Sequence, residues 1–487
     1  MSFTQNLIKH SFVYSLSGIL FKASNFILLP IYTRVLTPNE IGTIALLGTF
    51  FGLFRTVTYL GSQTGILREY LYNAKTKKDK LVTISTGHWG LLFIVSALSL
   101  PPIYFAIPIT EMLGIDKKYS ILIALLFLNN FQRITKYARD TYFRINEYSK
   151  KSLFWDNCEH LLDLIISITL VVFLKMGVFG VIYGQIASLF FIVVMFSPWF
   201  YKTLRYGFDF LIFKNIFSYG LNFVFLNITG WIMNLSDRWI IGEYWDLSVL
   251  GLYSVGYRFS NFIQVLNNGF KNQWGTSLYK MGDKESVSEL LVSSFMRYLA
   301  LAGFIWAFLT LFLREILIIM TPDYYHSAYE FTPIIIFGYL FLGFGNIWSA
   351  GLHLQNKAKW FWILSSIGAC TNIILNLIFI PKYGLFAAAI TTFISFSIQP
   401  IGYIIITKKS YDINLPYNKI ILSFVACFLI YICSNVLANS GINIYILIFI
   451  KSIIYTLFLY FNFYFQIINH DDFDKIKSKV FAFVGNN

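Results

Sequence analysis

VFGVIYGQIASLFFIVVMFSPWF occupies residues 178–200 and contains no charged residue. A helix of this length crosses a bilayer, whose hydrocarbon core needs about 20 consecutive apolar residues. Similar stretches follow one another along the rest of the chain, near 10–31, 40–63, 82–108, 119–143, 152–173, 214–240, 248–270, 289–313, 328–352, 360–380, 384–407, 418–438 and 442–467. The sequence therefore predicts an all-α polytopic membrane protein with fourteen transmembrane helices.

The composition favours a membrane protein over a soluble one. Of the 487 residues, 57% are hydrophobic and only 13% are charged, roughly half the charged share of a soluble domain. The net charge of +14 would indicate nucleic acid as the partner of a soluble protein. In a membrane protein, Lys and Arg collect in cytoplasmic loops instead, so we expect no nucleic-acid partner.

Lys and Arg are concentrated in every second connection between the predicted helices. With the N-terminus inside, nineteen of them lie in the connections expected in the cytoplasm and seven in those expected outside. The positive-inside rule therefore predicts that both termini are cytoplasmic. The first apolar run is too long for a signal peptide and lacks a small-residue cleavage site, so we expect a permanent span.

A short motif repeats at an interval of six predicted helices. Lys175-Met-Gly177-Val-Phe179-Gly180 recurs as Lys382-Tyr-Gly384-Leu-Phe386-Ala387. Because six is even, both blocks enter the membrane in the same direction, and a pseudo-twofold axis along the membrane normal would relate them. The prediction is an N-lobe at 1–207, a C-lobe at 208–410, and two extra helices with a tail at 411–487. Chance similarity between glycine-containing turns is the alternative.

The chain shows no signature of catalysis. The four cysteines lie in apolar segments without metal-binding spacing, and there is no Walker A motif. No connection is long enough to fold by itself. We therefore expect no enzymatic activity, no catalytic residue, no metal and no cofactor.

Three stretches resemble one known family. The stretch from Leu29-Pro30 through Thr37-Pro38-Asn39-Glu40-Ile41-Gly42 is similar to the first-helix signature of Wzx-type polysaccharide flippases, which belong to the multidrug/oligosaccharidyl-lipid/polysaccharide exporter superfamily. The family's later patterns resemble Ser236-Asp237-Arg238 with Val249 to Ser254, and Asn372 and Asn376 with Ile380 to Ser395. Ile41 departs from the family, which often has Tyr there. The resemblance implies two lobes around a cavity that opens alternately to each side.

The helices at 119–143 and 152–173 carry the densest set of polar residues. The first holds Arg133, Lys136 and Asp140 on one face with Arg139 beside them, and the second holds Asp156, Glu159, His160 and Asp163. A short turn makes the two helices antiparallel. We therefore expect Arg133 level with Asp163, Lys136 level with His160, and Asp140 level with Asp156.

These charges have two interpretations. They either form ion pairs that offset the cost of burial, or they work in transport. In the second case the basic groups line the cavity and the carboxylates couple an ion, with Asp163 as the first candidate. The candidate coupling residues are Asp140, Asp156, Glu159 and Asp163.

Three further cations are predicted singly at membrane depth, with no acid one turn away on the same helix: Lys22, Arg55 and Arg258. Such cations indicate a water-filled interior or an anionic ligand, and arginine suits phosphate because it donates two parallel hydrogen bonds. Snorkelling of the side chain to the interface is the alternative. The candidate substrate-binding cations are Lys22, Arg55, Arg133, Lys136, Arg139 and Arg258.

The resemblance implies a flippase for undecaprenyl-diphosphate-linked oligosaccharide units. It would move them from the cytoplasmic to the outer leaflet of a bacterial inner membrane by alternating access, for O-antigen (lipopolysaccharide), capsule or another surface polymer. Expected partners are membrane lipids, H⁺ or Na⁺ as coupling ion, and polysaccharide polymerase or assembly proteins. Two alternatives remain open: a multidrug cation antiporter of the same superfamily, and an integral-membrane glycosyltransferase or polymerase.

Overall fold

The computed structural model describes residues 26–465, apart from 147, 205–206, 279–283, 356, 358 and 409–412. Every element in this part of the chain is helical, as predicted. The described residues form two compact units, one with the chain up to Val255 and Ser365–Thr392, the other with Gly256–Leu364 and the chain from Phe393.

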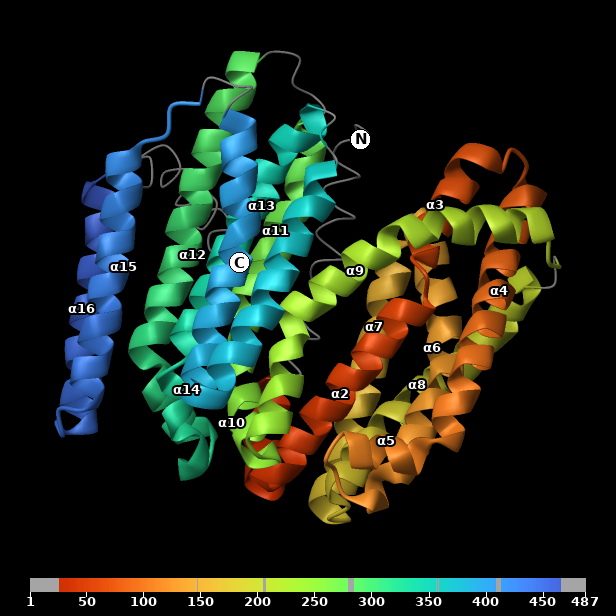
Figure 1. Cartoon of the computed structure of the whole chain (residues 1–487), viewed down its shortest axis with the longest axis horizontal. Coiled ribbons are helices and arrows are strands. Elements are labelled where there is room, and N and C mark those ends of the chain that lie inside the picture. Colours follow the sequence, from red (N-terminus) through yellow and green to blue (C-terminus); the bar gives the residue numbers. More distant parts are fainter. Residues whose placement is uncertain are drawn as a thin grey trace, which may run out of the picture. The chain divides into compact units, whose positions relative to one another are not determined.

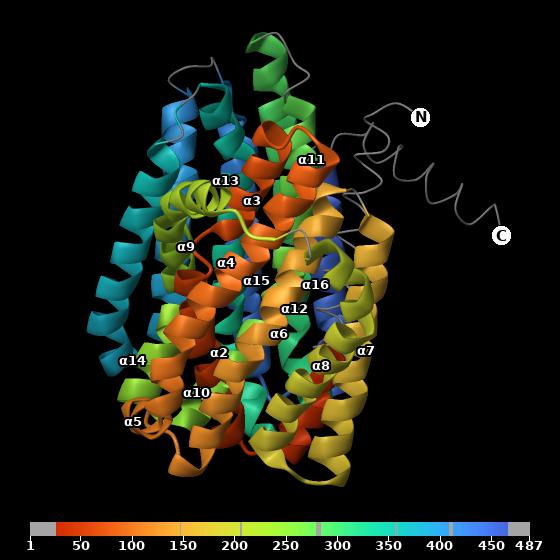
Figure 2. The same cartoon turned by 90° about the vertical axis from the view of Figure 1, so that its right-hand side faces the viewer.

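The first unit begins with the helix Phe26–Val35. Its remaining helices, with π-helical η1 and η3 and 3₁₀-helical η2, are α2 (Pro38–Thr58), α3 (Ser62–Arg68), η1 (Glu69–Asn73), α4 (Lys77–Tyr104), α5 (Ala106–Met112), η2 (Lys117–Tyr119), α6 (Ser120–Ile145), α7 (Ser149–Ile168), η3 (Thr169–Phe173), α8 (Gly177–Leu204), α9 (Phe210–Tyr244), most of α10 (Leu247–Arg258) and the middle of α14 (Lys359–Lys408). Figure 2 shows α6, α7 and α8 side by side.

The sequence determines where α2 begins. The Thr37 hydroxyl accepts a hydrogen bond from the Glu40 backbone N–H, and the Glu40 carboxylate accepts one from the Thr37 N–H at 2.9 Å. This capping box and Pro38 in the first turn satisfy or remove N–H groups that would otherwise lack partners. The motif residues at 37–40 therefore have a direct structural role.

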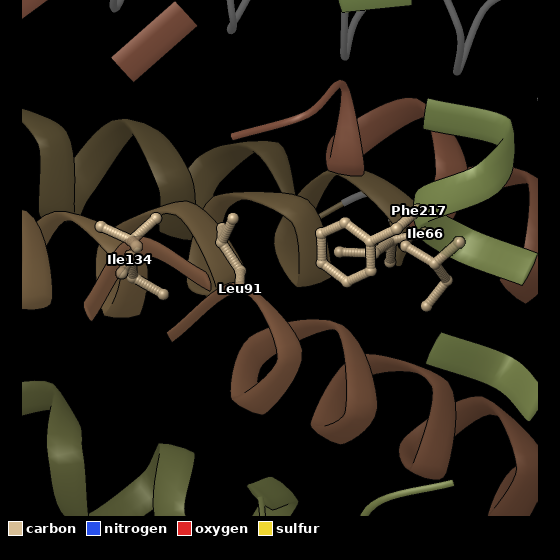
Figure 3. Close-up of a cluster of buried hydrophobic side chains, with 6 residues drawn as sticks. Ile66, Leu91, Ile134 and Phe217 are labelled. Atoms are coloured by element: carbon tan, nitrogen blue, oxygen red, sulfur yellow. The ribbon is translucent and has the colours of Figure 1, made fainter. Parts of the chain in front are cut away.

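A buried apolar cluster joins four helices of the first unit. Figure 3 shows Ile66 of α3, Leu91 of α4, Ile134 of α6 and Phe217 of α9, each at most 5% exposed. Helix α9 packs along α2 and α3 and curves in Figure 1. The α3–α9 contact is close, because a Cβ on Gly65 would lie 2.1 Å from the carbonyl oxygen of Ile216. These contacts fix α2 and α6 relative to each other.

The second unit contains α11 (Asn261–Leu278), α12 (Lys284–Met320), the 3₁₀ helix η4 (Asp323–Tyr329), α13 (Thr332–Leu354), the remainder of α14, α15 (Tyr417–Ala438) and α16 (Ile444–Tyr464). Helix α12 contacts α13, α15 and α16. Figure 1 shows α15 and α16, in blue, as an adjacent pair.

Two predicted stretches are divided by the structure. The stretch 40–63 is interrupted at Leu60 and Gly61, which both have positive φ angles (49° and 60°). The prediction of a single helix at 248–270 was wrong, because α10 ends at Arg258 and α11 begins at Asn261. There the backbone N–H groups of Phe259 and Ser260 donate to carbonyl oxygens three residues back, those of Gly256 and Tyr257, both at 3.1 Å, instead of the four-residue spacing of an α-helix.

Helix α14 combines the two predicted stretches 360–380 and 384–407. Its 50 residues contain one non-helical residue, Gly384, with φ 61° and ψ −138°. Positive φ is readily adopted by glycine, so this residue breaks the helix. A 50-residue helix would be about 75 Å long at 1.5 Å per residue, more than twice the thickness of the hydrocarbon core.

Nine helices within the described residues are long and apolar enough to span a membrane. They correspond to ten of the fourteen predicted stretches, because α14 covers two of them. Helices α6 and α7 are not among the nine, although their lengths of 26 and 20 residues suffice. Charged and amide side chains along both helices lower their hydropathy. These two polar helices adjoin the candidate site.

Candidate functional site

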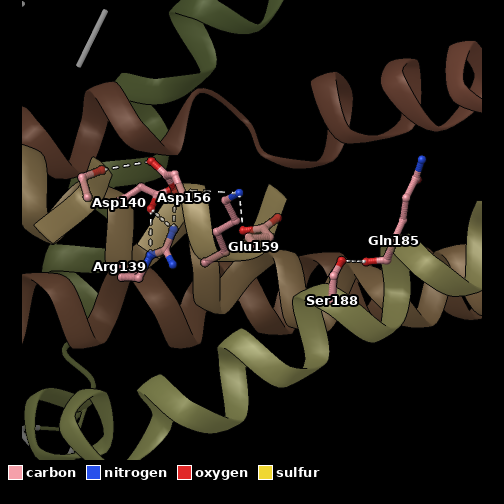
Figure 4. A network of polar contacts seen from close by, with 8 residues as sticks. Arg139, Asp140, Asp156, Glu159, Gln185 and Ser188 are labelled. Carbon is pink, nitrogen blue, oxygen red and sulfur yellow. Dashed lines mark hydrogen bonds and ion pairs between the residues drawn. The ribbon is translucent and has the colours of Figure 1, made fainter. Parts of the chain in front are cut away.

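Ion pairs connect α6 to α7 (Figure 4). The Lys136 ammonium lies 2.6 Å from the Glu159 carboxylate and 4.0 Å from that of Asp156. The Arg139 guanidinium contacts Asp140 at 2.7 Å and Asp156 at 2.8 Å, and its side chain is only 1% exposed. Lys136 and Arg139 thus each have a carboxylate partner.

The sequence predicted which residues of the two helices lie level, and the structure shows which of them form ion pairs. Asp140 and Asp156 approach the same guanidinium, whereas Lys136 is paired with Glu159 rather than placed against His160 alone. Arg139, which the sequence places beside the main stripe, is the more deeply buried cation. Its guanidinium belongs to the charged face because it contacts Asp140 on its own helix and Asp156 on α7.

A second polar site lies between α2, α6 and α8. It is a pocket of about 150 Å³, well above the roughly 15 Å³ that one water molecule needs. Its polar lining consists of Arg55 from α2, Asn130 and Arg133 from α6, and Gln185 from α8. Apolar side chains and one glycine complete it: Ile44, Leu47, Gly48, Phe51, Leu126 and Ile182.

The pocket has the electrostatics of an anion site. Among the residues that the structure describes, its lining contains two guanidinium groups and no carboxylate. The two arginines are close enough for their charges to interact. Arg55 donates to the carbonyl oxygen of Phe51 at 3.3 Å, and neither arginine forms an ion pair with a described residue. The Asn130 side chain is 1% exposed, and its Nδ2 has no partner in the described part of the chain.

Asp163 lies close to this pocket without belonging to its lining. Its carboxylate accepts a hydrogen bond from the Ser167 hydroxyl at 3.0 Å. The charges of Arg133 and Glu159 both act on it. Ser167 is fully buried against Gly184 of α8, the neighbour of the lining residue Gln185.

The structure thus separates the predicted site residues into groups. Arg55 and Arg133 share the pocket; Lys136 and Arg139 are paired with Glu159, Asp140 and Asp156. Arg258 ends α10 and belongs to the second unit. Lys22 lies outside the described residues.

Sequence reasoning missed a buried polar network around Asp237 of α9. The Asp237 carboxylate, 1% exposed, accepts a hydrogen bond from the Tyr253 hydroxyl. The neighbouring Ser236 hydroxyl donates to Asn372 at 2.9 Å, and Asn376 donates to the same oxygen at 3.0 Å. An acid within an apolar stretch was the available signal, because an ionisable group at membrane depth requires partners.

The second unit has a different kind of pocket, of about 370 Å³. Its lining is almost entirely apolar, with Phe337, Phe341, Phe393 and Phe424 among the residues. The indole N–H of Trp306 is already bonded to the carbonyl oxygen of Pro333 at 2.8 Å. This pocket therefore offers little to a charged group.

Comparison with known proteins identifies the family. The sequence model of a family described as "Polysaccharide biosynthesis protein" matches residues 31–327, more than half of the chain. The sequence matches none of the curated proteins with which it was compared.

Solved structures with the same fold are membrane transporters. An inward-facing multidrug resistance MATE family transporter of the MOP superfamily is 14% identical with a TM-score of 0.66, covering 82% of this chain and 94% of that one. The lipid II flippase MurJ, in an inward closed conformation, is 17% identical with a TM-score of 0.65, and the match covers 94% of this chain and 99% of the MurJ chain. At this identity the likeness establishes the fold, which the predicted superfamily resemblance anticipated.

Proposed function

Since the chain belongs to the family of polysaccharide biosynthesis proteins, we propose that it is a flippase for undecaprenyl-diphosphate-linked oligosaccharide repeat units. It moves them from the cytoplasmic to the outer leaflet of a bacterial inner membrane, for O-antigen, capsule or a related polymer. Its action is transport by alternating access, without a chemical reaction.

The pocket between α2, α6 and α8 is the observation that carries this proposal. Two guanidinium groups without a described carboxylate partner repel each other unless an anion or water lies between them. A diphosphate supplies several oxygens in the geometry that arginine recognises. The unpartnered Asn130 Nδ2 adds a third donor. The pocket therefore binds part of the lipid diphosphate.

The proposed architecture has fourteen spans in two six-helix lobes and an added pair. If α14 is counted as two spans and α6 and α7 are added to the nine candidate helices, the number of spans rises above nine. Gly177 and Gly384 of the repeated motif both have positive φ angles (58° and 61°), which supports related turns in the two lobes. The greater coverage by MurJ than by the MATE transporter, 94% against 82% of this chain, is consistent with added C-terminal helices.

The remaining predicted residues receive narrower roles. Substrate binding by Lys22 and Arg258, expected from the sequence, is part of the proposal. Lys136 and Arg139 act mainly through the carboxylates Asp140, Asp156 and Glu159, holding α6 against α7. The proposal also includes ion coupling by H⁺ or Na⁺, contact with polymerase or assembly proteins, and cytoplasmic termini.

A leaflet assay tests the proposal. The protein is reconstituted in vesicles that contain an undecaprenyl-diphosphate-linked oligosaccharide, and the sugar accessible outside is measured over time. We expect transport by the native chain and at least about a 100-fold loss in Arg55→Gln/Arg133→Gln, since two charge-assisted contacts are removed. Arg34→Gln, at the end of the first described helix, is the matched control and keeps its activity.

The two alternatives predict different results. A multidrug cation antiporter would accumulate organic cations and would bind them less tightly when carboxylates are removed; the described lining of this pocket has none. A glycosyltransferase or polymerase would extend the sugar without moving it. Sugar extension by the purified protein without translocation would contradict the flippase.

A further inference from the structure

The ion pairs between α6 and α7 resemble a ladder. Arg139 pairs with Asp156 at 2.8 Å, and Lys136, three residues earlier on α6, pairs with Glu159, three residues later on α7. Antiparallel helices advance in opposite directions, so each step along α6 has a matching step along α7. These two pairs are the closed rungs of the ladder.

The next step leads to an open rung. Three residues before Lys136 on α6 is Arg133, and the next residue on the acidic face of α7 is Asp163, four residues after Glu159. No ion pair joins them in the described chain, although their charges interact. Arg133 lines the pocket with Arg55, and Asp163 is bonded to the Ser167 hydroxyl at 3.0 Å.

Building on the proposed function, we infer that Arg133 exchanges between two anions, the Asp163 carboxylate and a phosphate group in the pocket. When the pocket is empty, Arg133 closes the third rung with Asp163. When phosphate enters, Arg133 binds it and Asp163 moves to the Ser167 hydroxyl, the hydrogen bond described above. The carboxylate is thus an internal competitor that takes the place of the departing substrate anion.

The geometry around Asp163 supports the exchange. Ser167 is fully buried, and a Cβ on Gly184 of α8 would lie 2.0 Å from its hydroxyl oxygen, so the hydroxyl occupies the space that the glycine leaves. Gln185, next to that glycine, belongs to the pocket lining. The position in which Asp163 is bonded to Ser167 therefore lies next to the pocket. Glu159, the nearest other acid on α7, is held by Lys136 at 2.6 Å and is not available to Arg133.

The test measures the affinity of the purified full-length protein for inorganic pyrophosphate by calorimetry at fixed ionic strength. Asp163→Asn removes the competitor, so the affinity should rise by about fivefold or more, the usual lower range of coupling between sites. Ser167→Ala releases the carboxylate toward Arg133, so the affinity should fall. Both effects should disappear when Arg133→Gln is added.

Ser152→Ala is the matched control. The Ser152 hydroxyl also donates to a carboxylate one turn away, at 3.3 Å, but that carboxylate is Asp156 of a closed rung. Its removal should leave pyrophosphate binding unchanged, and melting temperatures verify that each variant is folded. If Asp163→Asn does not fold, the fall in pyrophosphate affinity expected for Ser167→Ala tests the proposal instead.

The outcomes distinguish the two proposals. Pyrophosphate binding that depends on Arg55 and Arg133 but is unchanged or weakened in folded Asp163→Asn contradicts the exchange alone. Absence of pyrophosphate binding to the native protein overturns the exchange together with the proposed phosphate pocket.

Discussion

Arginines of one helix face different surroundings because their side chains point in different directions. Arg133 lines the pocket, whereas Arg139 is surrounded by Asp140 and Asp156. With 3.6 residues per turn, six residues correspond to a rotation of about 600°, which leaves the second side chain roughly 120° away from the first. Sequence spacing therefore predicted which residues lie near one another, but not which of them reach the pocket.

The first prediction concerns the buried guanidinium of Arg139. Arg139→Ala should lower the free energy of unfolding by about 3 kcal/mol, because Asp140 and Asp156 would be left close together without their shared cation. Denaturant-induced unfolding in detergent micelles measures the change. Any loss of transport in Arg139→Ala should come from weaker packing of α6 against α7 and not from a change in phosphate affinity.

Lys117→Ala provides the control for Arg139. Lys117 also forms a short ion pair, 2.7 Å from Glu111, but its side chain is 71% exposed. Exposed pairs contribute little, so unfolding should be unaffected. Equal destabilisation by the two variants would show that burial of Arg139 has no special importance.

At the scale of elements, a buried ion pair fixes α16 to α12. The Lys451 ammonium lies 2.7 Å from the Glu315 carboxylate, and the two side chains are 1% and 5% exposed. The Ser434 hydroxyl of α15 donates to the carbonyl oxygen of Thr310 on α12 at 2.7 Å. The sequence predicted α15 and α16 as an added pair, but it did not indicate their neighbour, because partners distant in the chain cannot be read from helical periodicity.

This pair gives a second prediction. Lys451→Met should destabilise the protein by about 3 kcal/mol, since Glu315 would remain charged and buried without a partner. Adding Glu315→Gln should restore most of the lost stability, because a neutral amide is much less costly to bury. Melting temperatures of the two single variants and the double variant measure the effect. A double variant that is less stable than both single variants would contradict the explanation.

The ends of two elements agree with the sequence. The helix predicted from residue 40 begins at Pro38, where Thr37 and Glu40 form a capping box, and the predicted boundary between residues 380 and 384 falls at the Gly384 break in α14. The division at Phe259–Ser260, where the backbone N–H groups bond three residues back, was missed because neither position holds Gly or Pro. Hydropathy alone does not indicate such a change of backbone hydrogen bonding.

At the scale of the whole molecule, the motifs predicted the fold better than the site. The resemblance at residues 29–42 indicated the superfamily, and the fold of the MATE transporter and MurJ agrees with it. The pocket could not be predicted, since it requires α2, α6 and α8 to meet. Their meeting depends on packing between distant segments, such as that of α3, α4, α6 and α9 in Figure 3.

The position of the bound diphosphate tests the account most directly. Electron cryo-microscopy of the protein in a lipid nanodisc, loaded with an undecaprenyl-diphosphate-linked oligosaccharide, would reveal it. We predict a phosphate group in the pocket between α2, α6 and α8, within hydrogen-bond distance of both Arg55 and Arg133. Phosphate bound elsewhere, with these two arginines held by protein carboxylates, would contradict the central claim.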